Sequence, residues 1–92
     1  MTAAADRHMA RVRELPCVAT LLIEGKRVPC EEVHHIQFVR DELSPFLIVP
    51  LSWRYHNPMS PIGLHALSRR GFERRYRISE LDLLGKTLEL LA

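Results

Sequence analysis

The chain has 92 residues, of which 47% are hydrophobic and 26% charged, and its formal net charge is +2. This length suits one domain near the lower limit for a single hydrophobic core, and no apolar run is long enough to cross a membrane. The positive charge excludes a strongly acidic nucleic-acid mimic, although it is too small to identify a nucleic-acid-binding protein by itself.

The first predicted element is a helix over residues 3–14, where apolar side chains have helical spacing and a proline, Pro16, follows. The N-terminal segment is charged and lacks an apolar signal core, so we expect a cytoplasmic protein. Residues 17–24 (CVATLLIE) predict a strand. A two-residue turn beginning at Gly25 would return the chain through residues 27–38 as the second strand of a β-hairpin.

The register of this hairpin bears on the two cysteines of the chain, Cys17 and Cys30. Pairing about the turn would place Leu21 opposite Cys30, and Cys17 near His34. The cysteines would then not be cross-strand partners, and a cytoplasmic setting also disfavours a disulfide. We therefore expect no disulfide.

The second half of the chain begins with a polar loop at residues 39–45, followed by FLIVPL (46–51), a short apolar run typical of a buried strand. A helix is predicted from Pro61, with Ser60 as its cap and Gly71 as a terminator or kink.

The last predicted element is a helix at about residues 79–91, which Ser79 and Asp82 would open with a capping box. Its leucines would form one apolar face, comprising Leu81, Leu84, Leu88 and Leu91. If that face were exposed, it could support a homodimer. An N-terminal helix, a β-hairpin, a short strand and C-terminal helices together predict a single α+β domain over residues 1–92.

Four of the five histidines lie between residues 34 and 65. His34 and His35 are adjacent, so on an extended segment their side chains point to opposite faces and need different roles. His56 follows the predicted buried strand, and His65 lies on the next helix. Imidazoles from separate elements can share one metal ion, while another neutral histidine can accept a proton from water. The alternative is a structural role for each histidine.

Two further sets of charged residues are candidates for the same chemistry. Glu31 and Glu32 precede the histidine pair and could orient the imidazoles or ligate an ion, although an exposed acidic pair is the simpler interpretation. Five arginines fall within nine residues: Arg69, Arg70, Arg74, Arg75 and Arg77. They could neutralise phosphates of a nucleic acid, or form a solvated helix face.

Three segments, EEVHHI, FLIVPLSWRYHN and LHALSRRGFERRYRIS, resemble the HNH (ββα-metal) nucleases. The similarity is to the small bacteriophage branch that includes the recombination-enhancement-function nucleases, and it covers residues 15–78. It implies a ββα-metal arrangement and metal-dependent endonuclease activity on DNA in the host cytoplasm.

Carried over position by position, the resemblance makes His34, His56 and His65 ligands of a divalent ion, which could be Mg, Mn, Ni or Zn. It makes His35 the general base that activates water. The family usually places its last two ligands about one helical turn apart, whereas eight residues, NPMSPIGL, separate His56 from His65. These residues must loop out if both histidines are to reach one ion.

The structural zinc site of the family is mostly missing from this sequence. Cys17 matches one ligand position, but Thr20, Ser52 and Tyr55 stand at the other three. Hydroxyl groups are poor zinc ligands, so we expect no structural zinc.

These departures leave alternatives to an active nuclease. The chain could be a nuclease-derived protein that binds nucleic acid without cutting it. It could also be a non-catalytic descendant that binds and inhibits a protein partner, such as a host defence complex of the CRISPR type. A third alternative is an interaction domain whose histidines are structural.

Overall fold

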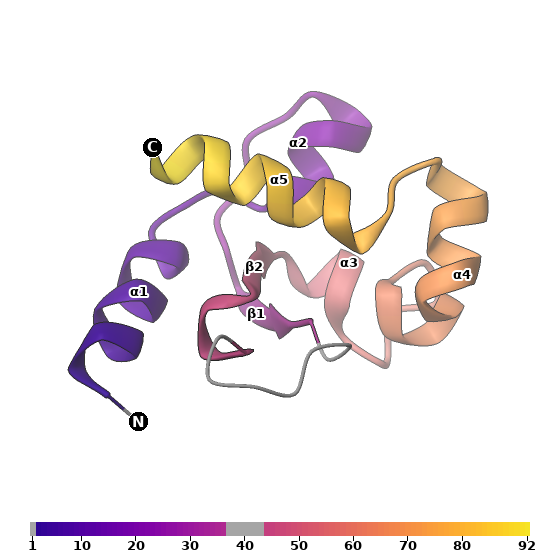
Figure 1. Ribbon diagram of the computed structural model, residues 1–92. Coiled ribbons are helices and arrows are strands. Elements are labelled where there is room, and N and C mark those ends of the chain that lie inside the picture. The colour runs from indigo at the N-terminus through magenta and orange to yellow at the C-terminus, as the bar shows by residue number, and fades with distance from the viewer. Residues whose placement is uncertain (1, 37–43) are drawn as a thin grey trace.

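The computed structural model describes residues 2–36 and 44–92, which form an α+β fold in which helices surround a two-stranded antiparallel sheet (Figure 1). Along the chain, the elements are α1 (Ala3–Arg13), α2 (Val18–Glu24), β1 (Glu32–His35), the 3₁₀ turn η1 (Ser44–Phe46), β2 (Ile48–Leu51), α3 (Trp53–His56), α4 (Leu64–Tyr76) and α5 (Glu80–Leu91). Most of the predicted loop at residues 39–45 lies outside the described residues. None of the described helices is both long enough and apolar enough to span a bilayer.

The first and last helices begin as the sequence predicts. The helix predicted at residues 3–14 is confirmed as α1, and the Thr2 side chain accepts a hydrogen bond from its first turn. The capping box of α5 is also confirmed. Ser79 N donates to Asp82 Oδ2 over 2.8 Å, and Asp82 N donates to Ser79 Oγ over 3.1 Å.

The strand predicted at residues 17–24 is wrong, because this segment forms helix α2. Cys17 caps the helix, and its Sγ accepts hydrogen bonds from the backbone N and the hydroxyl of Thr20. Gly25 ends the helix with a φ of +66°, a left-handed conformation that glycine adopts without strain. An apolar run this short fits either a strand or a buried helix, so its composition could not decide between them.

The predicted hairpin is therefore also wrong, and β1 pairs instead with β2. In the observed register His34 lies opposite Val49, so the pairings predicted for Leu21 with Cys30 and for Cys17 with His34 do not form. Both cysteines are free thiols. The sheet thus joins two segments that a long connection separates, rather than neighbours across a tight turn.

The short buried strand predicted at residues 46–51 is confirmed as β2, and all four of its residues are buried. Helices α1, α2 and α5 pack against it, which makes it the centre of the fold. The main core cluster draws on β2, on four helices and on Ile36 directly after β1, and includes Val18, Ala19, Ile36, Val49, Leu51, Tyr55, Leu64, Phe72 and Leu83.

Helix α4 begins at Leu64, three residues after the predicted start at Pro61. Its kink lies at Ser68, where φ is +67°, rather than at Gly71. Ser68 Oγ accepts a hydrogen bond from Gly71 N over 3.2 Å, so Ser68 caps the second part of α4. A positive φ at a serine is costly backbone geometry, and such strain often lies at functional sites.

The apolar face predicted for the last helix is only partly observed. Leu81 and Leu88 are 60% and 52% exposed, whereas Leu83 and Thr87 are fully buried. The Thr87 hydroxyl is satisfied by donating to the carbonyl of Leu83. The helix is turned so that Glu80, a buried carboxylate in its first turn, faces inward together with Leu83 and Thr87.

This orientation of α5 predicts unequal effects for two neighbouring leucines. Leu83→Ala removes a fully buried side chain and should lower the free energy of unfolding by roughly 2–5 kcal/mol. Leu81→Ala, the matched control, should change it by less than about 0.5 kcal/mol. Urea denaturation of both variants measures the difference, and equal losses would contradict the observed orientation.

Candidate metal centre

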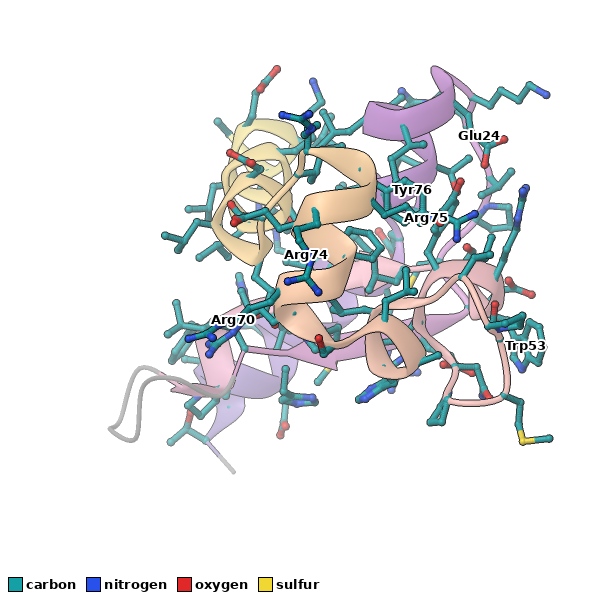
Figure 2. The ribbon with its side chains drawn as sticks, turned by 90° about the vertical axis from the view of Figure 1, so that its right-hand side faces the viewer. Glu24, Trp53, Arg70, Arg74, Arg75 and Tyr76 are labelled. Carbon is teal, nitrogen blue, oxygen red and sulfur yellow. The ribbon has the colours of Figure 1, made fainter. Side chains whose placement is uncertain are left out.

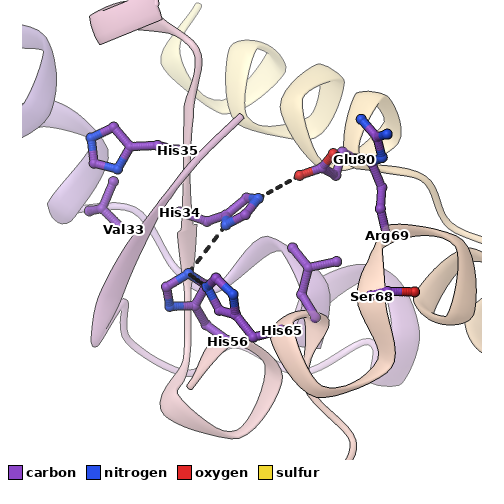
Figure 3. A pocket seen from close by; sticks show the side chains of 9 residues that line it. Val33, His34, His35, His56, His65, Ser68, Arg69 and Glu80 are labelled. Atoms are coloured by element: carbon purple, nitrogen blue, oxygen red, sulfur yellow. Dashed lines mark hydrogen bonds and ion pairs between the residues drawn. The ribbon is translucent and has the colours of Figure 1, made fainter. Parts of the chain in front are cut away.

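The three histidines predicted as metal ligands lie together beside the sheet (Figure 3). His34 Nδ1 lies 3.2 Å from His56 Nε2, which in turn lies 3.1 Å from His65 Nε2. One nitrogen from each ring lies within 4.8 Å of the others, so the three rings could hold one ion. The rings come from β1, α3 and α4, which confirms that the candidate ligands converge from separate elements.

The eight residues between His56 and His65 loop out as a compact turn. The Ser60 hydroxyl donates to the carbonyl oxygen of Arg54, so it braces this turn instead of capping a helix. A Cβ added at Gly63 would lie 3.2 Å from the backbone of Arg54 and 3.3 Å from His56 N. The absence of a side chain at residue 63 therefore lets the start of α4 approach the end of α3 closely.

Carboxylates contact the outer nitrogens of two of the rings. His56 Nδ1 lies 2.7 Å from Glu32 Oε1, and His34 Nε2 lies 2.5 Å from Glu80 Oε2. Asn57 Nδ2 donates to the second oxygen of Glu32 over 2.8 Å. Each of these rings thus has one nitrogen against a carboxylate and the other turned toward the cluster. Carboxylate contacts of this kind orient histidines in metal sites.

Glu32 is therefore more than an exposed acid, because its carboxylate contacts one of the candidate ligands, His56. It lies two residues before His34 on the same strand, a spacing that places both side chains on one face. Glu31 has a different role, because its carboxylate accepts a hydrogen bond from Trp53 N at the start of α3. Glu80 was missed by the sequence analysis, since a carboxylate in the first turn of a capped helix has an ordinary local explanation.

Burial sets the protonation of His34. It lowers the pKa of His34 below the usual 6.5, and this effect outweighs the contact with Glu80, which acts in the opposite direction. The pKa of Glu32 is also lowered, first by the hydrogen bond from Asn57 and then by His56. At neutral pH the cluster therefore offers a neutral His34, the form that ligates metal ions.

The three rings line an open pocket of about 400 Å³. Its wall also includes Leu64, Ser68, Arg69 and Glu80. The pocket is larger than a metal ion needs, so a substrate group could enter beside an ion held by the rings.

His35 lies at the same pocket but outside the cluster. Its side chain is exposed and points away from the His34 ring, as expected for neighbours on a strand (Figure 3). The role of His35 as a general base stays a prediction.

The five predicted phosphate-binding arginines, Arg69, Arg70, Arg74, Arg75 and Arg77, are all exposed on α4 or at its C-terminal end. Arg69 lines the histidine pocket, and its Nε lies 3.8 Å from Glu80 Oε1. Figure 2 shows Arg70, Arg74 and Arg75 on the outer side of α4, and the Arg75 guanidinium lies over the Tyr76 ring. None of these three lines the histidine pocket, so Arg69 is the member of the set placed beside the candidate ligands.

The residues at the family's zinc positions make other contacts. Thr20 donates to Cys17 Sγ, and the Tyr55 hydroxyl donates to Glu24. Burial, reinforced by Glu24, raises the pKa of Tyr55, so it stays a phenol. Ser52 Oγ is buried without a hydrogen-bond partner among the described residues. The expected absence of a structural zinc stays a prediction.

Comparison with protein-family models found no match, and comparison with curated proteins also found none. The resemblance to HNH nucleases in the segments EEVHHI, FLIVPLSWRYHN and LHALSRRGFERRYRIS therefore stays a prediction.

The lowered pKa of His34 predicts how stability depends on pH. Below pH 6.5 the unfolded chain protonates His34 more readily than the folded protein does. The free energy of unfolding of the metal-free protein should therefore be highest above pH 6.5 and should fall as the pH drops through the lowered pKa of the folded state. Urea denaturation in chelator between about pH 7.5 and about pH 5.5 measures the slope. His34→Gln should reduce that slope, and an unchanged slope in this variant would contradict the assignment.

The close approach at Gly63 predicts a second effect. Gly63→Ala should push the start of α4 away from the end of α3, which separates His65 from His56. Metal binding should weaken by roughly tenfold or more. Gly85→Ala is the control, because a Cβ there meets nothing within 4 Å. It should leave affinity unchanged and stabilise α5 by roughly 0.5–1 kcal/mol. Calorimetric titration with Zn²⁺ compares the two variants, and wild-type affinity in Gly63→Ala would refute the prediction.

Proposed function

We propose that the protein is a divalent-metal-dependent endonuclease of the HNH (ββα-metal) type that hydrolyses phosphodiester bonds in DNA. The observation that carries this proposal is the convergence of His34, His56 and His65 in an open pocket beside Arg69. The order of the elements around the rings, two antiparallel strands followed by helices, supports it.

The donor set of the pocket fits a transition-metal ion. Three imidazoles suit zinc or nickel better than magnesium, which prefers oxygen ligands. Glu32 and Glu80 hold two of the rings in place, as carboxylates commonly do around such ions. When bound, the ion would polarise a phosphate oxygen and stabilise the negative charge that develops during hydrolysis.

Side chains at the rim of the pocket and on α4 would bind phosphates and activate water. Arg69 can donate two parallel hydrogen bonds to a phosphate that enters the pocket. The other arginines of α4 can neutralise neighbouring phosphates along a strand of DNA. His35 is the proposed general base. An exposed side chain at the end of a strand can rotate, and His35 would have to turn toward the three-histidine cluster to take a proton from a water there.

A second candidate function is nucleic-acid binding without cleavage. The orientation of His35 favours it, because the side chain proposed as the base is not aimed at the cluster (Figure 3). The arginines and the metal-binding rings would still attract a polyanion. Among the described residues, no contact favours the predicted inhibition of a host defence complex or the predicted homodimer, and both stay predictions.

A plasmid-nicking assay tests the proposal. Supercoiled DNA is incubated with the protein and Mg²⁺, Mn²⁺, Ni²⁺ or Zn²⁺. The wild type should nick the plasmid, and His56→Ala should abolish nicking because it removes a ligand. His35→Ala should slow nicking by about 10²–10⁴-fold while metal affinity is kept. His8→Ala is the matched control, since His8 lies on α1 against Phe46 and outside the cluster.

The outcomes separate the candidate functions. Binding of metal and DNA without nicking would support the non-catalytic candidate. Nicking that persists in His56→Ala would point to a contaminating nuclease. A wild-type protein that binds neither metal nor DNA would refute both candidates.

A further inference from the structure

We propose that Glu80 is a positioning residue of the metal centre, which determines the nitrogen that His34 presents to the ion. The inference rests on the metal centre of the proposed function, but not on phosphodiester hydrolysis. Residue 80 lies outside residues 15–78, the segment that resembles the nucleases, so the resemblance assigns it no role. Helix α5 would then be part of the centre rather than an accessory to it.

The Glu80 carboxylate is buried and fixed in position, so few groups lie within its reach. Its side chain is 9% exposed, and its Oε2 lies 2.5 Å from His34 Nε2 (Figure 3). The capping box of Ser79 and Asp82 fixes the start of α5 immediately before it. Leu83, one turn later on the same face, anchors the helix in the core. A carboxylate so buried needs a polar partner, and the His34 ring supplies one.

The contact decides between the two neutral forms of the His34 ring. An ionised carboxylate only accepts hydrogen bonds, so the nitrogen facing Glu80 must carry the hydrogen. With the hydrogen on Nε2, the lone pair is on Nδ1, the atom that lies 3.2 Å from His56 Nε2 in the cluster. The other form would turn a lone pair toward the carboxylate and an N–H toward the ion. Glu80 therefore favours the form that can ligate.

The neighbouring ring shows the same arrangement with its nitrogens exchanged. Glu32 lies against Nδ1 of His56, which leaves Nε2 for the ion. His65 also presents Nε2 to the cluster. The centre would thus use Nδ1 of one ring and Nε2 of two. Its two orienting carboxylates come from different elements, Glu32 from β1 and Glu80 from α5.

Two variants separate the effect on the ring from an effect on packing. Glu80→Gln keeps the size and a hydrogen bond, but an amide can donate as well as accept and no longer excludes either form of the ring. Glu80→Leu removes the hydrogen bond altogether. Glu89→Gln is the matched control, because Glu89 lies on the same helix, is exposed and contacts Lys86.

Histidine ¹⁵N–¹H correlation spectra of the metal-free proteins identify the protonated nitrogen of His34, and titration with Co²⁺ measures affinity. We expect His34 to carry its hydrogen on Nε2 in the wild type and in Glu89→Gln. In Glu80→Gln and Glu80→Leu we expect a mixture of both forms and a loss of roughly 10–100-fold in Co²⁺ affinity. Circular dichroism checks that the variants keep their helices.

An unchanged His34 form in both Glu80 variants would overturn the proposal, even if affinity fell, because the effect would then be structural. An equal loss of affinity in Glu89→Gln would overturn it as well. Normal Co²⁺ binding without nicking would reject only the hydrolytic function. A wild-type protein that binds no Co²⁺ would reject the metal centre, whereas the spectra of the metal-free proteins would still show whether Glu80 selects the form of His34.

Discussion

A buried contact between an imidazole and a carboxylate joins the sheet to the last helix of this protein. The side chains of His34 and Glu80 are only 10% and 9% exposed, so each needs polar partners within the protein, and each supplies one to the other. The contact also accounts for the rotation of α5. With Glu80 turned inward, Leu83 and Thr87 follow it into the core, and the leucines on the other side of the helix face solvent. Packing and the candidate centre therefore share one constraint.

The same constraint explains why a small fold can bring three rings together. Strand β2 is fully buried and packs against α1, α2 and α5, so β1 is held firmly at its side. His34 then projects from β1 toward the ends of α3 and α4. The turn around Gly63 lets those helix ends approach closely enough for His56 and His65 to meet it. The rings are placed by backbone contacts rather than by flexible side chains, which suits a metal site.

The arginines and His35 are less completely organised than the ligands. Arg69 is the arginine that lines the pocket, and the rest of the set is spread over an exposed helix. Exposed charges can attract a polyanion, although they do not fix its orientation. His35 follows the alternation of its strand and points away from the cluster. A nuclease that uses His35 as its base would need this side chain to turn toward the cluster, whereas a nucleic-acid-binding protein would not.

Local sequence determined several features by itself. It set the helix at residues 3–14, the capping box of α5, the buried strand and the opposite orientations of His34 and His35, because each depends on neighbours within a few residues. The apolar run at residues 17–24 fits both a strand and a helix, and only tertiary structure decided for the helix, with β1 pairing to β2 instead. The meeting of His34 with Glu80, 46 residues away, was also decided at that level. Such contacts depend on how distant elements pack, which local patterns do not encode.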